Sequence, residues 1–317
     1  MGEVIHPGVF VEEVPTGARP IEGVSTSTAA FVGTTAIGPE DAPLLVSSVD
    51  EFEHAYGAEC ALWRAVRAFF DHGGSRLYVQ RVAAKDYAAA LRALEPVDEI
   101  AVVAAPGAPV AAEVIEHAER ARYRFAIVED GDALRRLDSS FGAAYLGDGL
   151  DAPASAYAAA VYARTDAWRP PADESASGER VNVVRLADDG SVRIAGARTL
   201  SSDPEWKYVN VRRYFIYLEH SLDRGTQWTV FEPNGEELWT TLRTAISDFL
   251  LVELRRGALA ARTPEEAFFV RCDRSTMTQD VLDDGRLVCV VGVAPLRPAE
   301  FVIVRIGRWT ADHDHDD

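Results

Sequence analysis

Short apolar runs alternate with helical patterns over residues 44–128, and this alternation restricts the possible folds more than any other feature of the chain. The runs contain apolar residues such as Leu77 and Val79, and the segments between them repeat apolar residues at helical spacing. The expected strands are 44–46, 76–82, 100–104 and 124–128, and the expected helices are 49–56, 61–72, 86–94 and 110–122. Strands joined by helices of this length form right-handed crossovers, so the sequence predicts an α/β (mixed α+β) fold with a mainly parallel sheet flanked by helices.

Two of the expected helices have marked starts. Ser48 and Glu51 match a capping box before the helix at 49–56. In residues 228–257, a β-like run at Trp228–Phe231 stops at a Pro-Asn-Gly turn, and Asn234 is the predicted N-cap of a long amphipathic helix. The apolar positions Leu238, Leu242, Ile246 and Phe249 share one face of that helix, and Gly257 ends it.

The rest of the chain gives weaker signals. Residues 130–180 are irregular around one alanine-rich helix at 154–164. A hairpin of strands 181–186 and 191–198, a helix at 207–223 and strands at 267–273, 286–294 and 300–308 are expected after it. Residues 1–22 have too little apolar area to fold alone, so we expect an extended arm that is either disordered or completed by another surface.

Composition excludes several classes of function. The formal net charge of −18 over 317 residues argues against nucleic acid as a partner, because phosphate binding needs clustered Lys and Arg. No apolar run approaches the ~20 residues of a membrane-spanning helix, and the first residues lack the basic start of a signal peptide. The three cysteines are widely spaced, which favours reduced thiols in a cytoplasmic setting over a disulfide framework.

A search for catalytic and ligand motifs finds little. There is no GxSxG elbow, P-loop or GxGxxG motif, and the histidines are expected at helix positions with polar or boundary surroundings or in the termini. His313-Asp314-His315-Asp316 offers metal ligands at the chain end without a second shell to orient them, so a solvated tail is expected. We therefore predict no catalytic, cofactor-binding or metal residues and no cofactor.

Three long segments resemble contractile phage tail sheath proteins, in the order found in that family. The first is PGVFVEEVPTGARPIEGVSTSTAAFVGTTAIGP, followed by FFDHGGSRLYVQRV, and the second is GARTLSSDPEWKYVNVRRYFIYLEHSL. The third begins at VFEPNGEELW and continues through GRLVCVVGVAPLRPAEFVIVRIGRW. Together they cover well over half of the chain. The resemblance divides it into an arm (1–22), a shortened subtilisin-like region (23–195), a C-terminal core (196–298) and a terminal strand arm with an acidic tail (299–317).

The resemblance implies a structural subunit, not an enzyme, that polymerises helically in stacked rings around an inner tube and contracts to drive the tube through a target envelope. The expected partners are further copies of the chain, the inner tube protein, baseplate and terminal cap proteins and any sheath paralogues, with no nucleic acid and no direct membrane insertion. Assembly is expected in the bacterial cytoplasm, after which the subunit would be part of a phage tail or of a released injection particle. The alternatives are a non-polymerising α/β hydrolase or a ligand-binding protein on the same scaffold.

The resemblance also suggests which residues make these contacts. Terminal strands are expected to cross to neighbouring subunits and join a sheet there. The residues of these arms are Val4, Val9, Phe10, Val11, Val14, Phe301, Val302, Ile303, Val304 and Ile306. Glu253, Arg255 and Arg256, at the end of the long helix, are candidate contacts to the inner tube.

Overall fold

The computed structural model describes residues 19–58, 60–129, 136–147, 149–170, 180–296 and 302–309. Its larger part is an eight-stranded sheet in the order β2-β3-β1-β4-β5-β6-β7-β8. The strands are β1 (Thr28–Gly33), β2 (Leu44–Val46), β3 (Arg76–Arg81), β4 (Val102–Ala104), β5 (Phe125–Val128), β6 (Gly142–Gly147), β7 (Val181–Leu186) and β8 (Val192–Ala195). Pairing is parallel from β3 to β7 and antiparallel only at the two ends, β2 with β3 and β7 with β8. The predicted mainly parallel sheet is therefore confirmed.

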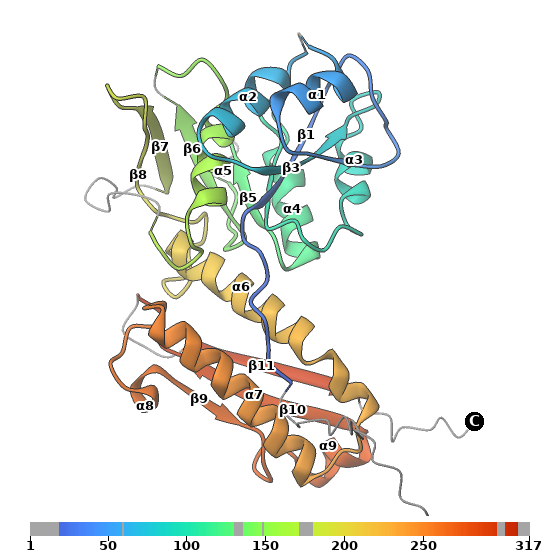
Figure 1. Cartoon of the computed structure of the whole chain (residues 1–317), viewed down its shortest axis with the longest axis vertical. Helices are drawn as coiled ribbons and strands as arrows, with labels where there is room; N and C mark the ends of the chain where they lie inside the picture. The colour runs from blue at the N-terminus through green and yellow to red at the C-terminus, as the bar shows by residue number, and fades with distance from the viewer. Residues whose placement is uncertain are drawn as a thin grey trace, which may run out of the picture.

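Helices cover both faces of this sheet (Figure 1). They are α1 (Val49–Tyr56), α2 (Trp63–Asp71), α3 (Tyr87–Ala93), α4 (Ala111–Ala121) and α5 (Ala154–Arg164). Side chains of α1, α2 and α5 share one core with Phe31, and those of α3 and α4 share a second core with Val32. Because neighbouring residues of β1 point to opposite faces, this central strand is buried on both sides, and Thr28 is the one polar residue in it.

The C-terminal part is a smaller layer of helices on a three-stranded sheet of order β11-β10-β9 (Figure 1). Its elements are α6 (Val209–Gly225), η3 (Gln227–Phe231), α7 (Glu236–Arg255), α8 (Pro264–Ala267), β9 (Phe268–Arg271), α9 (Gln279–Asp283), β10 (Arg286–Val293) and β11 (Val302–Trp309). Leu242 and Ile246 of α7 lie with Leu287 and Val291 of β10 in one buried cluster. This cluster is the third core of the molecule.

Helix α6 joins the two parts. Its residues Val209 and Ile216 belong to the core that α1, α2 and α5 form on the large sheet. Tyr214 and Leu218 belong to the core of the three-stranded sheet. The helix is buried on nearly every side. Its mixed pattern of apolar and basic residues would instead predict one exposed face.

Local differences from the expected elements have simple physical causes. The capping box is confirmed in its main bond, since the Glu51 amide donates to Ser48 Oγ at 3.1 Å and Gly57 ends α1 with φ of 80°. Trp228–Phe231 was wrongly expected as a strand: it forms the 3-10 helix η3 directly after α6. Asn234 does not cap α7, because its amide donates to the Arg286 carbonyl and accepts from the Trp239 indole at 2.8 Å.

The strand β6 was missed within the region expected to be irregular. Gly142–Gly147 is a short run of mostly small residues, and it lies between β5, which precedes it in the chain, and β7, which follows it after α5. Its pairing therefore depends on tertiary contacts that the local pattern does not carry. The short helix α9 was also missed, although Thr278 caps it through a bond from the Val281 amide.

Candidate assembly surfaces

The end of the chain pairs with its own sheet. Strand β11 lies antiparallel to β10, from Val302 opposite Val293 to Trp309 opposite Arg286. Because β11 is an edge strand among the described residues, one side of its backbone remains open to a further strand. Phe301 and the arm residues Val4, Val9, Phe10, Val11 and Val14 lie outside the described residues.

The register fixes which backbone groups face that open side. Strand β10 is antiparallel to β9, with Val293 opposite Phe268. The next pair along the two strands is Ala294 and Ala267, and the Ala294 amide donates to the Ala267 carbonyl at 2.8 Å. Even-numbered residues of β10 therefore direct their amides toward β9, and odd-numbered ones direct theirs toward β11. In β11, Val304 and Ile306 are the partners of Val291 and Cys289, so their amides face β10. The amides of Ile303 and Gly307 face outward.

The remaining predicted arm residues thus lie in a strand that is paired within the chain. Side chains of Val304 and Ile306 pack against the core of the three-stranded sheet. Val302 and Ile303 lie in the same strand through their backbone. Exchange of this strand between copies stays a prediction.

A strap of residues 19–27 enters from the N-terminal side and runs along α6 toward β1 (Figure 1). Ile21 is buried against Gly225, and the Val24 amide donates to Ser221 Oγ at 3.1 Å. Gly23 lies so close to the Tyr217 ring that any Cβ there would overlap its hydroxyl group. The strap is therefore held by specific contacts up to the first described residue.

That first residue, Arg19, is attached to η3. Its guanidinium forms an ion pair with Glu232 at 2.9 Å and lies over the Trp228 ring at 4.5 Å. A pocket of about 680 Å³ begins beside it and follows the outer side of α7, where Thr240, Thr244 and Val252 line it.

Of the three candidate tube contacts, Glu253 does not reach the surface. The residue is 1 % exposed, and its carboxylate accepts hydrogen bonds from Tyr217 Oη and from Arg256 Nη1, both at 3.1 Å, and lies 3.5 Å from Tyr214 Oη. Burial raises the pKa of Glu253, while the bonds from Tyr217 and Arg256 act in the opposite direction. Its role in this structure is to hold its neighbours in place. Arg255 and Arg256 are exposed, and contact with a tube stays a prediction for these two.

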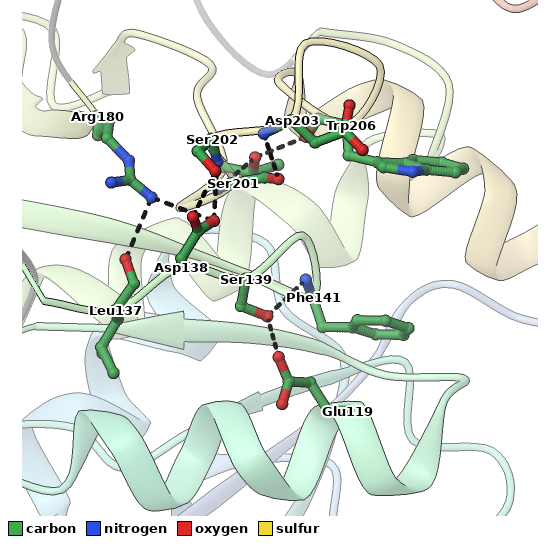
Figure 2. A network of polar contacts seen from close by, with 11 residues as sticks. Glu119, Leu137, Asp138, Ser139, Phe141, Arg180, Ser201, Ser202, Asp203 and Trp206 are labelled. Atoms are coloured by element: carbon green, nitrogen blue, oxygen red, sulfur yellow. Dashed lines mark hydrogen bonds and ion pairs between the residues drawn. The ribbon is translucent and has the colours of Figure 1, made fainter.

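A polar network ties the start of the C-terminal part to the large sheet (Figure 2). Asp138 accepts hydrogen bonds from the Ser202 amide at 2.8 Å and from the Ser202 hydroxyl, and it pairs with Arg180 at 3.5 Å. These bonds hold the pKa of Asp138 below its usual value. Beside it, Ser139 donates to Glu119 of α4 at 2.6 Å and accepts from the Phe141 amide.

Deeper in the same junction the polar groups are buried. Asn182 of β7 donates to the carbonyls of Ala144 and Arg198 and accepts from the Arg198 amide at 2.8 Å. Arg212 of α6 lies between the rings of Phe141 and Trp206, at 4.0 and 4.7 Å from their centroids. The sequence feature that corresponds to this junction is the pair of adjacent arginines, Arg212 and Arg213, whose burial depends on aromatic rings from other segments.

The structure also places the groups considered for metal binding and catalysis. No group of three His, Cys, Asp or Glu side chains that could hold a metal ion occurs among them. His117, expected at a polar or boundary position, is instead fully buried, and burial beside Arg124 lowers its pKa to about 3. The His220 ring stacks on Tyr123 and contacts Asp98 at 3.1 Å. Within the described part of the chain, no helix is both long and apolar enough to span a membrane.

Comparison with known proteins connects this arrangement to one family. The family model for the phage tail sheath C-terminal domain matches residues 201–307, the segment from the junction to β11. The sheath of PVC, an extracellular contractile injection system, solved in its contracted state, superposes with a TM-score of 0.79 at 26 % identity. That superposition covers 96 % of this chain and 98 % of the PVC chain. Residues 201–307 thus match the phage tail sheath C-terminal domain, and nearly the whole chain is similar in sequence and fold to contractile sheath subunits.

Two further relatives agree with this placement. The contracted helical sheath of the anti-feeding prophage AFP has a TM-score of 0.76 and 28 % identity, over 96 % of this chain and 99 % of that one. The tail sheath protein of Enterobacteria phage T4 is 24 % identical over 193 residues. This match spans 52 % of the present chain and 28 % of the T4 protein, so the chain is similar in extent to the injection-system sheaths and much shorter than the T4 sheath.

Proposed function

We propose that this chain is the structural subunit of a contractile sheath, which polymerises helically around an inner tube and shortens to drive that tube through a target envelope. The observation that carries the proposal is the likeness to the PVC and AFP sheath subunits over 96 % of the chain. A hydrolase on the same scaffold is not favoured, since the relatives are structural sheath proteins, and we infer that this chain is not an enzyme.

We infer that β11 is exchanged between neighbouring subunits. In a single chain it occupies the edge of β10, and the same register would be satisfied by β11 of another copy because the pairing involves backbone groups. An N-terminal arm containing Val9, Phe10 and Val11 would be passed to a neighbour in the same way. Such exchange keeps subunits connected while their cores change orientation.

The proposed roles differ between the arms and the two regions of the subunit. Residues 1–22 and 299–317 would act as arms, 23–195 as the first region of the subunit and 196–298 as its C-terminal core, which agrees with the separate cores of the two sheets. The proposed partners are copies of the chain, an inner tube contacted through Arg255 and Arg256, baseplate and terminal cap proteins, and sheath paralogues where they exist. Assembly would take place in the bacterial cytoplasm, and the subunit would then be part of a phage tail or of a released injection particle.

Electron microscopy of negatively stained protein tests the proposal directly. The full chain should form hollow striated cylinders, whereas a variant lacking residues 1–15 should remain unassembled while retaining its fold by circular dichroism. A variant lacking residues 310–317, which follow β11, is the matched control and should form cylinders. Cylinders of normal length from the variant without residues 1–15 would refute the exchange of the N-terminal arm, and a compact monomer from the full chain would count against a sheath subunit.

A further inference from the structure

The large hydrophobic side chain most exposed among the described residues belongs to Phe231, at the end of η3. It is 82 % exposed, and Val230 beside it is 37 % exposed. An aromatic ring open to water to this degree loses the stabilisation that burial normally gives it, and apolar residues grouped in this way commonly mark a contact surface. Trp228 in the same short helix is by contrast covered by Arg19.

The described chain begins at the same place. Arg19 is fixed against η3 by its ion pair with Glu232, the residue that follows Phe231, and by its position over Trp228. The five residues before it, Val14-Pro15-Thr16-Gly17-Ala18, must therefore start next to η3. Fully extended, five residues reach about 17 Å, which is long enough for Val14 and Pro15 to contact the Phe231 ring when the segment turns toward η3.

We propose that residues 14–18 of the same chain dock on Phe231 and Val230, so that η3 is the anchor of the N-terminal arm. Proximity and chemistry both point to this segment as the one that covers Phe231. The segment is tethered at Arg19, and Val14 and Pro15 are the apolar side chains nearest to that tether that have the size to cover a phenyl ring. A proline also loses little conformational entropy on docking, because its φ is already fixed.

This inference rests on the proposed function and adds a mechanical division of the arm. Residues 14–18 would stay with their own subunit, and only the part before Val14 would be passed to a neighbour. The neighbour's pull on the arm would then be received at η3, where Arg19, Glu232 and Phe231 hold the chain. Without such an anchor the pull would act on Ile21 and Val24 and would peel the strap from α6.

A photo-crosslinking experiment identifies what covers Phe231. The full chain is prepared with p-benzoylphenylalanine in place of Phe231, as an equal mixture of ¹⁴N and ¹⁵N protein, and is irradiated both unassembled and as sheath. Crosslinked peptides are then assigned by mass spectrometry. We expect crosslinks to residues 14–18 in both samples, with both peptides carrying the same isotope. Mixed-isotope crosslinks, crosslinks to another segment, or none above background would each overturn the proposal.

A substitution gives a second, quantitative readout. In the unassembled protein, Phe231→Ala should speed amide hydrogen exchange at Thr16, Gly17 and Ala18 by about ten- to hundredfold, the factor that corresponds to losing the burial of one phenyl ring. Ile37→Ala, which removes another exposed apolar side chain (55 % exposed), is the control and should leave these rates unchanged. Equal rates in wild type and Phe231→Ala would refute the anchor. Both readouts include a measurement on unassembled protein, so the anchor can be tested even where the chain forms no sheath.

Discussion

The alternation of backbone groups in β11 makes a sharp prediction about sheath assembly. Val304 directs its amide toward β10, opposite Val291, whereas Gly307 directs its amide to the open edge. Val304→Pro therefore removes a bond of the β10–β11 ladder, and Gly307→Pro removes only a donor on the free edge. Proline is tolerated at edge positions whose amide points outward, and space is open around Gly307.

The size of the effect can be worked out from the groups involved. Val304→Pro loses one backbone hydrogen bond, worth about 0.5–1.5 kcal/mol, and leaves the carbonyl of the buried Val291 without its partner, which costs roughly 1–3 kcal/mol. Together these weaken strand pairing by about 2–4 kcal/mol, which lowers the equilibrium constant for pairing by roughly 30- to 1000-fold. Gly307→Pro should cost less than about 1 kcal/mol.

Sedimentation of assembled protein at a series of concentrations measures the consequence. If β11 of one copy pairs with β10 of the next, Val304→Pro should raise the concentration needed for assembly by at least the lower of these factors. Gly307→Pro should assemble as the wild type does, unless a further strand adds to the outer edge of β11. Wild-type assembly by Val304→Pro would refute exchange through the β10 ladder. Failure of Gly307→Pro alone would show that the outer edge carries the contact.

Three further predictions concern the unassembled subunit and use urea unfolding. Gly23→Ala should lower the free energy of unfolding by about 1–3 kcal/mol, because the new Cβ overlaps Tyr217; Gly307→Ala, in open space on the edge strand, should change it by only about a few tenths, and equal effects would contradict the strap contact. Asn182→Ala should cost about 2–4 kcal/mol, since three buried backbone groups lose their partner, and a change below 0.5 kcal/mol would refute that role of the side chain. The pKa of Glu253 is raised in the folded state, so its protonated form stabilises the fold at pH values below the ordinary 4.5, and this contribution is lost as the pH rises through the folded-state pKa. Glu253→Gln should therefore gain stability relative to wild type as the pH is raised from about 4.5 to 7, and a difference independent of pH would contradict a buried, titrating carboxyl group.

The alternation over residues 44–128 was sufficient to predict the parallel sheet, because its strands contain apolar runs, which are continuous in β4 and β5, and its helices each bury an apolar face. The helix at 154–164 was predicted to the residue, whereas β6 needed contacts with β5 and β7 to form. Trp228–Phe231 shows the opposite failure. Its residues favour a strand, but tertiary contacts hold it as a turn of helix between α6 and Asn234.

The candidate surfaces were predictable only in part. The terminal strand was located correctly from its apolar run, but its partner in a single chain is set by the register with β10, which no local pattern contains. Glu253 looked like a surface charge near a helix end. Its burial follows from Tyr214 and Tyr217, which come from a helix more than thirty residues earlier in the chain.

Helix α6 has a consequence for how a sheath built from such subunits would change shape. It has 17 residues and is therefore about 26 Å long, and it contributes side chains to the cores of both sheets. A rod shared in this way cannot bend without opening one of those cores. The subunit should thus behave as a rigid body, and the large rotations of contraction would occur at the flexible connections between subunits. The free energy released on contraction would then be stored in the interfaces between subunits along the cylinder, and not as strain within a single subunit.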